Sequence, residues 1–226
     1  MIVENLESVR QRIRRSCEKA GREPSDVTLV AVTKEAAADE AKEALRLGVQ
    51  DLGENRVRDA ISKYGVIGSS ATWHLIGHLQ TNKVKDAVRI FSLIHSVDSA
   101  RLAKEIDKEA AKINKVQDIL IQVNTSGEKT KFGVSPEGVF DLLNEVKIYQ
   151  NISIRGLMTI APEVDNPEKV RPYFKALREL RDKINNLQLT TYNLQLLSMG
   201  MSNDFEIAIE EGSNMVRLGR AIFKKT

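Results

Sequence analysis

Short apolar segments alternate with longer amphipathic segments along almost the whole chain, and this alternation restricts the fold more than any other feature. The apolar segments are rich in Val, Ile and Leu and carry few charges. Strands that are apolar on both faces and are separated by helices are typical of a parallel sheet. Eight segments therefore predict strands, at Val27–Thr33, Val49–Gly53, Thr72–Gly77, Leu93–Val97, Ile119–Val123, Ile154–Thr159, Leu194–Met199 and Met215–Leu218.

The intervening segments repeat their apolar residues every three to four positions, which predicts helices. They lie at Ala37–Leu47, Arg56–Tyr64, Thr81–Arg89, Ala100–Ile113, Pro136–Tyr149, Pro167–Leu187 and Asp204–Glu211, and one extra helix precedes them at Leu6–Ala20. Eight such units in a chain of this length predict an α/β fold, a single (β/α)8 TIM barrel with an extra N-terminal helix. An open, doubly wound sheet is the alternative, because periodicity alone cannot close a barrel.

Length and composition favour one domain. The chain has 226 residues, of which 42% are hydrophobic and 29% are charged, so it can bury a sizeable core and does not have a disordered composition. No linker rich in Pro, Gly or Ser and no low-complexity segment marks a boundary. We therefore expect residues 1–226 to form one domain.

The charge balance gives little indication of a nucleic-acid partner. Lys and Arg number 34 against 31 Asp and Glu, and aromatic residues make up 5% of the chain. Binding of nucleic acid needs a concentrated basic patch, and single strands also need aromatic stacking surfaces. The basic first helix, with Arg10, Arg12, Arg14 and Arg15, is the only support for a nucleotide-binding or protein-binding module. We expect no nucleic-acid partner.

Cysteine usage and the N-terminal sequence indicate the compartment. Cys17 is the only cysteine, so no intrachain disulfide can form, which is typical of a reducing environment. The N-terminal residues do not have the basic and apolar regions of a secretory signal, and no apolar run is long enough to span a bilayer. We expect a soluble, cytoplasmic protein with no membrane association.

Polar residues gather where the predicted strands end, which is where barrels and α/β sheets build their ligand sites. Lys34 directly follows the apolar strand Val27–Thr33. Burial at that place would remove water from the ammonium group and lower its pKa, and a neutral amine is the nucleophile that forms a Schiff base with an aldehyde or ketone. The alternative is a lysine that reaches solvent or pairs with Glu54.

The last two strand ends carry features of a phosphate site. The segment from Ser198 to Asp204 offers hydroxyls, small residues and backbone N–H groups before a helix. Arg217 lies within the last strand and Gly219 follows it, where a ligand can approach the backbone. Plain N-capping for the first segment and a structural salt bridge for Arg217 are the alternatives.

The histidines do not predict a metal site. His74 and His78 have the spacing of a helical metal pair, but they lie in a predicted strand, where four residues span about 13 Å. His95 is the only other histidine, and Cys17 is remote from all three in sequence. We therefore expect no zinc site. The sequence also has no Ser-His-Asp pattern, P-loop or dinucleotide-binding fingerprint.

Six motifs occur in series along the chain: Val-Ala-Val-Thr-Lys34, Gly53-Glu-Asn-Arg56, Trp73-His-Leu-Ile-Gly-His-Leu-Gln-Thr-Asn-Lys83, Gly156-Leu-Met-Thr, Leu197-Ser-Met-Gly-Met-Ser-Asn-Asp204 and Val216-Arg-Leu-Gly219. Together, over essentially the whole chain and in the same order, they resemble one known family, the pyridoxal phosphate homeostasis proteins. The resemblance implies a barrel like the N-terminal domain of alanine racemase, which is PLP fold type III. It also implies that the cofactor is pyridoxal 5'-phosphate (PLP).

The resemblance also implies residue roles. Lys34 would hold PLP as an internal aldimine, and Ser198 with the backbone at Gly219 and Arg220 would hold the phosphate. Arg217 would face the pyridine nitrogen. The resemblance further implies that Asn55 and His78 line the pocket.

These roles predict a cofactor carrier involved in PLP homeostasis, and indirectly in amino-acid and keto-acid balance, without catalytic turnover. An arginine beside the pyridine nitrogen disfavours its protonation, so the ring is a weak electron sink. Racemases of this class use a second acid or base from an additional domain, for which we find no counterpart here. The alternatives are a PLP-dependent racemase or decarboxylase and a Schiff-base aldolase. We expect a monomer that delivers PLP to client enzymes.

Overall fold

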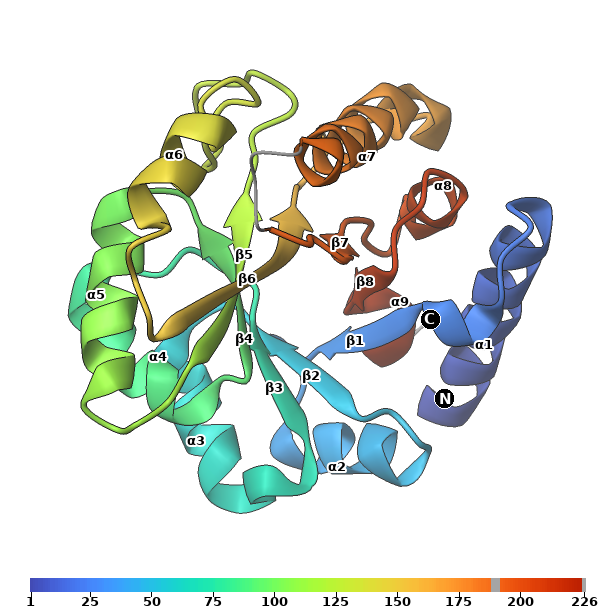
Figure 1. Ribbon diagram of the computed structural model, residues 1–226. Coiled ribbons are helices and arrows are strands. Elements are labelled where there is room, and N and C mark those ends of the chain that lie inside the picture. The colour runs from blue at the N-terminus through green and yellow to red at the C-terminus, as the bar shows by residue number, and fades with distance from the viewer. Residues whose placement is uncertain (188–191, 225–226) are drawn as a thin grey trace.

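The computed structural model describes residues 1–187 and 192–224, and in them eight parallel strands close into a barrel in sequence order (Figure 1). Each strand pairs with its neighbours along the chain, and β8 pairs with β1. The barrel prediction is therefore confirmed, and the open sheet is excluded. The strands are β1 (Thr28–Val32), β2 (Asp51–Glu54), β3 (Thr72–Leu75), β4 (Leu93–Val97), β5 (Gln117–Gln122), β6 (Ile152–Met158), β7 (Leu196–Ser198) and β8 (Met215–Leu218).

Helices follow the strands and form the outer ring. In chain order they are α1 (Ile2–Lys19), α2 (Ala38–Arg46), α3 (Val57–Ile67), α4 (Val84–Ile90), α5 (Ala100–Ala111), α6 (Val139–Val146), α7 (Arg171–Asn186), α8 (Phe205–Glu210) and α9 (Arg220–Phe223). Four single-turn 3₁₀ helices are interspersed among them: η1 (Pro24–Asp26), η2 (Gly68–Ser70), η3 (Thr81–Lys83) and η4 (Pro167–Val170). Each predicted helix is found, with bounds that differ by a few residues, and the short α9 was not predicted.

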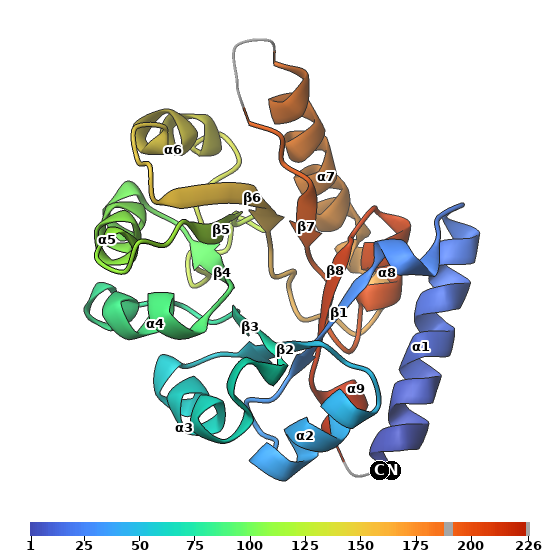
Figure 2. The same cartoon turned by 60° about the horizontal axis from the view of Figure 1, so that its bottom comes forward.

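The N-terminal helix completes the ring. In the described part of the chain, the helix after β8 is the four-residue α9, and α1 packs against α8, α9 and α2 beside the junction of β8 with β1 (Figure 2). Its apolar stripe is buried, with Leu6 and Val9 each 1% exposed. Asn5 Nδ2 also donates to the backbone oxygen of Ile222 at 2.9 Å. The extra helix of the prediction thus takes the position of the eighth barrel helix.

The apolar core has two parts. The larger part lies between the strands and the surrounding helices, where Trp73, Phe91 and Phe174 are almost fully buried. The smaller part is formed by Val30, Leu93, Leu120, Met158 and Met215. Because alternate strand residues point to opposite faces of the sheet, this second cluster fills one part of the barrel interior. The buried polar side chains of His74, His95, Ser198 and Arg217 occupy another part of the interior.

Gly156 shows how closely the strands approach each other. A Cβ atom at this position would lie 1.9 Å from the backbone oxygen of Leu196 on the neighbouring strand β7. A glycine is therefore required where β6 and β7 pair. No helix in the described part of the chain is long and apolar enough to cross a membrane.

We predict that Val9→Ala destabilises the protein by about 1–3 kcal/mol, because two buried methyl groups of α1 are removed and the space is only partly refilled. Val3→Ala is the matched control, since Val3 lies in the same helix and is 42% exposed. Its effect should stay within about 0.5 kcal/mol. Urea denaturation followed by circular dichroism measures both, and equal effects would show that α1 does not seal the barrel.

Candidate functional site

A cleft opens at the carboxyl ends of the strands, the end of a barrel where ligands bind. Its volume is about 550 Å³. Its walls come from the ends of β1, β2 and β8, from the segment between β6 and α7, and from the loop between β7 and α8. Among the described residues, the charged side chains that line it are those of Lys34, Glu35, Lys131, Glu163, Asp204, Arg217 and Arg220.

Lys34 lines the cleft just after β1. Its side chain is 48% exposed, and Nζ lies 3.6 Å from a carboxylate oxygen of Glu35. The expectation that burial removes water from this amine is therefore wrong, because the loop after β1 turns the side chain into the open cleft. The alternative pairing with Glu54 is also wrong.

Glu54 is paired with a different lysine. The Nζ atom of Lys63 lies 2.6 Å from Glu54 Oε1, and the hydroxyl of Thr33 donates to the same oxygen at 2.6 Å. Lys63 also donates to the backbone oxygen of Thr33. These bonds join the ends of β1 and β2. They engage Glu54 through Oε1, and the Lys34 side chain instead lines the cleft.

Asn55 follows β2 and also lines the cleft. Its Oδ1 atom is buried and has no hydrogen-bond partner among the described residues. The backbone here is fixed by close contact with Gly77, where a Cβ atom would lie 2.2 Å from the Asn55 backbone oxygen. A buried polar atom without a partner carries a free-energy cost. Asn55 is therefore suited to bond a molecule in the cleft.

The loop between β7 and α8 lies beside the end of β8, where the backbone oxygen of Gly200 accepts from the backbone N–H of Arg217 at 3.0 Å. Gly200 has φ = +96°, and a Cβ atom there would lie 2.6 Å from Ala208 Cβ, so the turn requires glycine. Asp204 Oδ1 accepts from the backbone N–H of Met201 at 2.6 Å, and Ser202 Oγ accepts from that of Ala221 at 3.2 Å. The second bond joins the loop to α9, next to Gly219 and Arg220. Hydroxyl and backbone groups converge here as an anion site requires.

Arg217 forms the floor of the cleft and is 3% exposed. Its Nη2 donates to the backbone oxygen of Thr159 at 2.8 Å, and its Nη1 donates to Ser198 Oγ at 2.6 Å. Burial lowers the pKa of Arg217 to about 10, partly offset by the charge of Asp204. The guanidinium therefore stays cationic at neutral pH.

A chain of buried side chains continues from Arg217 through the barrel. Ser198 Oγ lies 2.9 Å from His95 Nδ1, and His95 Nε2 lies 3.0 Å from His74 Nδ1. His74 Nε2 lies 2.8 Å from Asp51 Oδ1, at the amino end of β2. Burial lowers the pKa of His95 well below 6.5, and the neighbouring His74 and Arg217 contribute in the same direction, so His95 is neutral.

The structure brings most of the predicted residues together, with two exceptions. Lys34, Asn55, Arg217, Gly219 and Arg220 line the cleft. Ser198 is fully buried beneath it and bonds to Arg217 and His95, whereas Ser202 is the serine that lines the wall.

His78 lies in the loop after β3, outside the cleft lining. Its ring stacks on that of Phe132 with centroids 4.0 Å apart, and Nδ1 lies 3.9 Å from Asp98 Oδ2. The predicted third strand extended to Gly77, but β3 ends at Leu75, which moves His78 off the sheet. In residues 1–187 and 192–224, no group of three or more His, Cys, Asp or Glu side chains is placed to hold a metal ion.

Sequence reasoning missed His95. The histidine and the following Ser96 interrupt the apolar strand Leu93–Val97, and both are fully buried. A polar pair within an otherwise apolar strand was the available signal, because such residues need partners inside the barrel.

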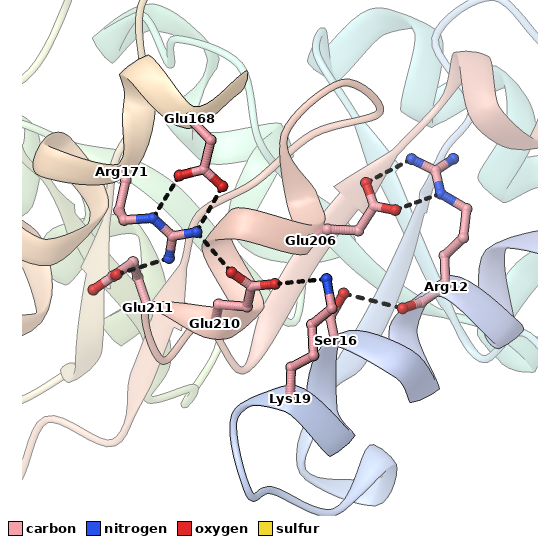
Figure 3. A network of polar contacts seen from close by, with 8 residues as sticks. All are labelled: Arg12, Ser16, Lys19, Glu168, Arg171, Glu206, Glu210 and Glu211. Carbon is pink, nitrogen blue, oxygen red and sulfur yellow. Dashed lines mark hydrogen bonds and ion pairs between the residues drawn. The ribbon is translucent and has the colours of Figure 1, made fainter. Parts of the chain in front are cut away.

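An ion-pair network fixes the walls of the cleft from outside (Figure 3). Arg171, at the start of α7, donates to Glu168 at 2.8 Å, to Glu210 at 2.7 Å and to Glu211 at 3.0 Å. These bonds raise the pKa of Arg171, and they lower that of Glu168. They connect the segment between β6 and α7 to α8, the helix that follows the loop after β7.

The same network extends to the N-terminal helix. Arg12 of α1 donates to both carboxylate oxygens of Glu206 at 2.8 and 2.7 Å, and Lys19 lies 3.5 Å from Glu210 (Figure 3). The bidentate pair lowers the pKa of Glu206. Arg12 and Lys19 of the basic first helix are therefore engaged in ion pairs within the protein.

Comparison with known proteins first defines the class. Residues 5–226 match the family described as "Alanine racemase, N-terminal domain". The "Pyridoxal phosphate homeostasis protein" of Aquifex aeolicus is 46% identical over 223 residues, which is 97% of this chain and 96% of that protein. The protein of the same name from Pseudomonas aeruginosa is 37% identical, covering 98% of this chain and 94% of that protein.

Solved structures agree. PipY of Synechococcus elongatus PCC7942, solved with PLP bound, superposes with a TM-score of 0.87 at 34% identity, covering 99% of this chain and 100% of that one. The chain is a barrel of the alanine racemase N-terminal domain class. Within that class it belongs to the pyridoxal phosphate homeostasis protein family, as the six sequence motifs predicted.

We predict that the neutral state of His95 makes stability depend on pH. Its pKa is lower in the folded protein than the value of 6.5 expected in the unfolded chain, so the unfolded chain binds more protons in the interval between them. The contribution is fully present above about pH 6.5 and is lost as the pH falls below it, by at most about 1.4 kcal/mol per pH unit.

Urea denaturation between about pH 8 and pH 5 tests this in the wild type, His95→Asn and His78→Asn. His78 is the matched control, because it takes no part in the series of buried hydrogen bonds from Arg217 to Asp51. In the His95 variant, the free energy of unfolding should depend less steeply on pH than in the wild type. In the His78 variant, the pH dependence should be unchanged. Identical slopes in all three proteins would contradict the assignment.

Proposed function

We propose that this protein binds PLP in the cleft and acts in PLP homeostasis, and so indirectly in the balance of amino and keto acids. The observation that carries the proposal is that one cleft combines an accessible lysine amine, a buried arginine and a small-residue loop suited to an anion. Relatives that cover nearly the whole chain are named for PLP homeostasis, and PipY was solved with PLP bound. When bound, PLP supplies an aldehyde that condenses with an amine, releasing water, and a ring that withdraws electrons.

Each cleft residue has a role in this proposal. Lys34 supplies the amine that holds the aldehyde carbon. Ser202, together with the backbone at Gly219 and Arg220, binds the phosphate, and the Arg220 guanidinium adds positive charge. Asn55 offers its otherwise unpaired amide oxygen as an acceptor to the bound molecule. Ser198 acts on the site through Arg217, because its hydroxyl is already occupied by protein partners.

Arg217 favours a carrier over an enzyme. A guanidinium that remains cationic disfavours a second positive charge, so a pyridine nitrogen bound beside it stays unprotonated. Such a ring stabilises a carbanion poorly. The tyrosines lie away from the cleft: Tyr64 in α3, Tyr173 in α7, Tyr149 before β6, and Tyr192, whose hydroxyl donates to the backbone oxygen of Leu143. We propose that the protein holds PLP without catalytic turnover.

The remaining properties follow from the same proposal. Residues 1–226 act as one PLP-binding domain, and the protein is a cytoplasmic monomer that supplies PLP-dependent client enzymes. The lone Cys17 is consistent with a reducing compartment, since it is buried and unpaired in a disulfide. A PLP-dependent racemase or decarboxylase and a Schiff-base aldolase remain the alternatives.

We predict that the purified protein with PLP absorbs visible light and that borohydride fixes the cofactor on the peptide containing Lys34. Lys34→Ala should abolish the borohydride-stable label but retain weaker binding through the phosphate contacts. Lys131→Ala is the matched control, because Lys131 lines the same cleft. Mass spectrometry of the peptides locates the label. A label on a different lysine would disprove the assignment.

We predict that turnover is absent. Incubation of the PLP-loaded protein with amino acids in deuterium oxide should show no sustained exchange of the α-hydrogen above the rate of free PLP. Proton NMR of the amino acid measures this exchange. Exchange at enzymatic rates that Lys34→Ala abolishes would replace the carrier by a PLP-dependent enzyme.

A further inference from the structure

The polar half of the barrel interior is an unbroken chain between two faces of the protein. It starts at Arg217, which lines the cleft, and passes through Ser198, His95 and His74 to Asp51. The Asp51 side chain is 22% exposed and lines a hollow at the amino ends of β1 and β2. The three residues between the ends are each at most 2% exposed.

Donor and acceptor chemistry assigns one direction to this chain. A guanidinium has only donors, so Ser198 Oγ accepts from Arg217. The described residues give Ser198 Oγ one other partner, His95 Nδ1, so the hydroxyl hydrogen points to that nitrogen. His95 then carries its proton on Nε2 and donates to His74 Nδ1. His74 carries its proton on Nε2 and donates to the carboxylate of Asp51.

The reverse direction leaves a group unsatisfied. If His74 donated to His95, then His95 would carry its proton on Nδ1 and donate to Ser198 Oγ. That oxygen would accept two hydrogen bonds, and the Ser198 hydroxyl hydrogen would have no acceptor among the described residues. Loss of a buried hydrogen bond is costly, so the direction from Arg217 to Asp51 is preferred.

Such a chain has a cost that packing alone does not explain. The other half of the interior is filled by Val30, Leu93, Leu120, Met158 and Met215, as is usual for this type of barrel. Replacing a buried polar network by apolar residues is often neutral or stabilising. The hydrogen-bonded series starts at the guanidinium of Arg217 in the cleft floor. From Ser198 onward, every donor points away from Arg217 and toward the carboxylate of Asp51.

We propose that His95, His74 and Asp51 are positioning residues that orient Arg217 toward the bound cofactor, with Asp51 fixing the direction of the chain from the opposite face of the barrel. This inference rests on the proposed function. When His95 accepts the hydroxyl hydrogen of Ser198, that hydrogen is held away from Arg217 and the oxygen lone pairs face the guanidinium. Asp51 favours this arrangement because it holds the His74 proton on Nε2, which leaves His74 Nδ1 to accept from His95. A substitution at Asp51 therefore alters the orientation of Arg217 in the cleft, although Asp51 does not contact the cofactor.

The first test uses the protein without cofactor, so it does not depend on PLP binding. In protein labelled with ¹⁵N-histidine, long-range proton–nitrogen NMR should show both His74 and His95 protonated on Nε2 alone. His78→Gln assigns the third ring, which lies outside the chain. A proton on Nδ1 of His95 overturns the proposal.

The second test measures transmission to the cleft. Asp51→Ala should raise the PLP dissociation constant by about 3-fold to 10-fold and shift the absorption band of bound PLP. Asp51→Asn, which keeps an acceptor oxygen for His74, should restore both toward the wild type. Asp118→Ala is the matched control, because Asp118 also lies near the amino end of a strand and pairs only loosely with Arg155, at 3.8 Å.

The two proposals fail in different ways. An unchanged band and dissociation constant in folded Asp51→Ala overturn the positioning role while PLP binding stands. If the wild type does not bind PLP, the proposed function fails, and the positioning role toward the cofactor fails with it. The histidine tautomers in the cofactor-free protein still establish whether the chain runs from Arg217 to Asp51. If Asp51→Ala does not fold, Asp51→Asn and the wild-type tautomers decide the direction.

Discussion

The buried guanidinium of Arg217 is the constraint on which the site depends. A charge at 3% exposure inside a barrel needs acceptors within the barrel, and the backbone oxygen of Thr159 after β6 and the hydroxyl of Ser198 in β7 supply them, while Asp204 after β7 adds a favourable charge. Ser198 in turn requires His95, and His95 requires His74. The polar half of the interior is thus the consequence of placing one cation beneath the cleft. The apolar half can then be filled by ordinary aliphatic side chains.

The outer shell keeps this floor and its walls in place. Besides the strand ends, the walls include the connections after β6 and after β7. Arg171 ties the first to α8, and the bidentate pair between Arg12 and Glu206 ties α8 to α1. Because α1 also occupies the eighth position of the helical ring, the same helix completes the barrel and supports the cleft. Exposed ion pairs contribute little individually, but several that share partners restrict these connections together.

The sequence was informative wherever local pattern carries the signal. Apolar runs located every strand, position at a strand end was enough to select Lys34 and Gly219 for the cleft, and the family resemblance added Asn55. Prediction was wrong where a property depends on what surrounds a side chain. Burial of the Lys34 amine, its pairing with Glu54 and the extent of β3 were all wrong, because the turn after β1, the position of Lys63 and the close contact at Gly77 are not visible in local sequence. The roles given to individual cleft residues stay predictions.

The sequence by itself determined the class of fold, the family and the lysine on which the proposed function depends, because strand periodicity and ordered motifs are local patterns that can be recognised in the amino-acid sequence alone. Tertiary structure alone decided that the sheet closes, that α1 serves as the eighth helix, and that His95, His74 and Asp51 join Arg217. The physical reason is that hydrogen bonds and burial depend on distances between residues far apart in the chain. Ser198 and His95 are separated by 103 positions, and only barrel closure brings them to 2.9 Å.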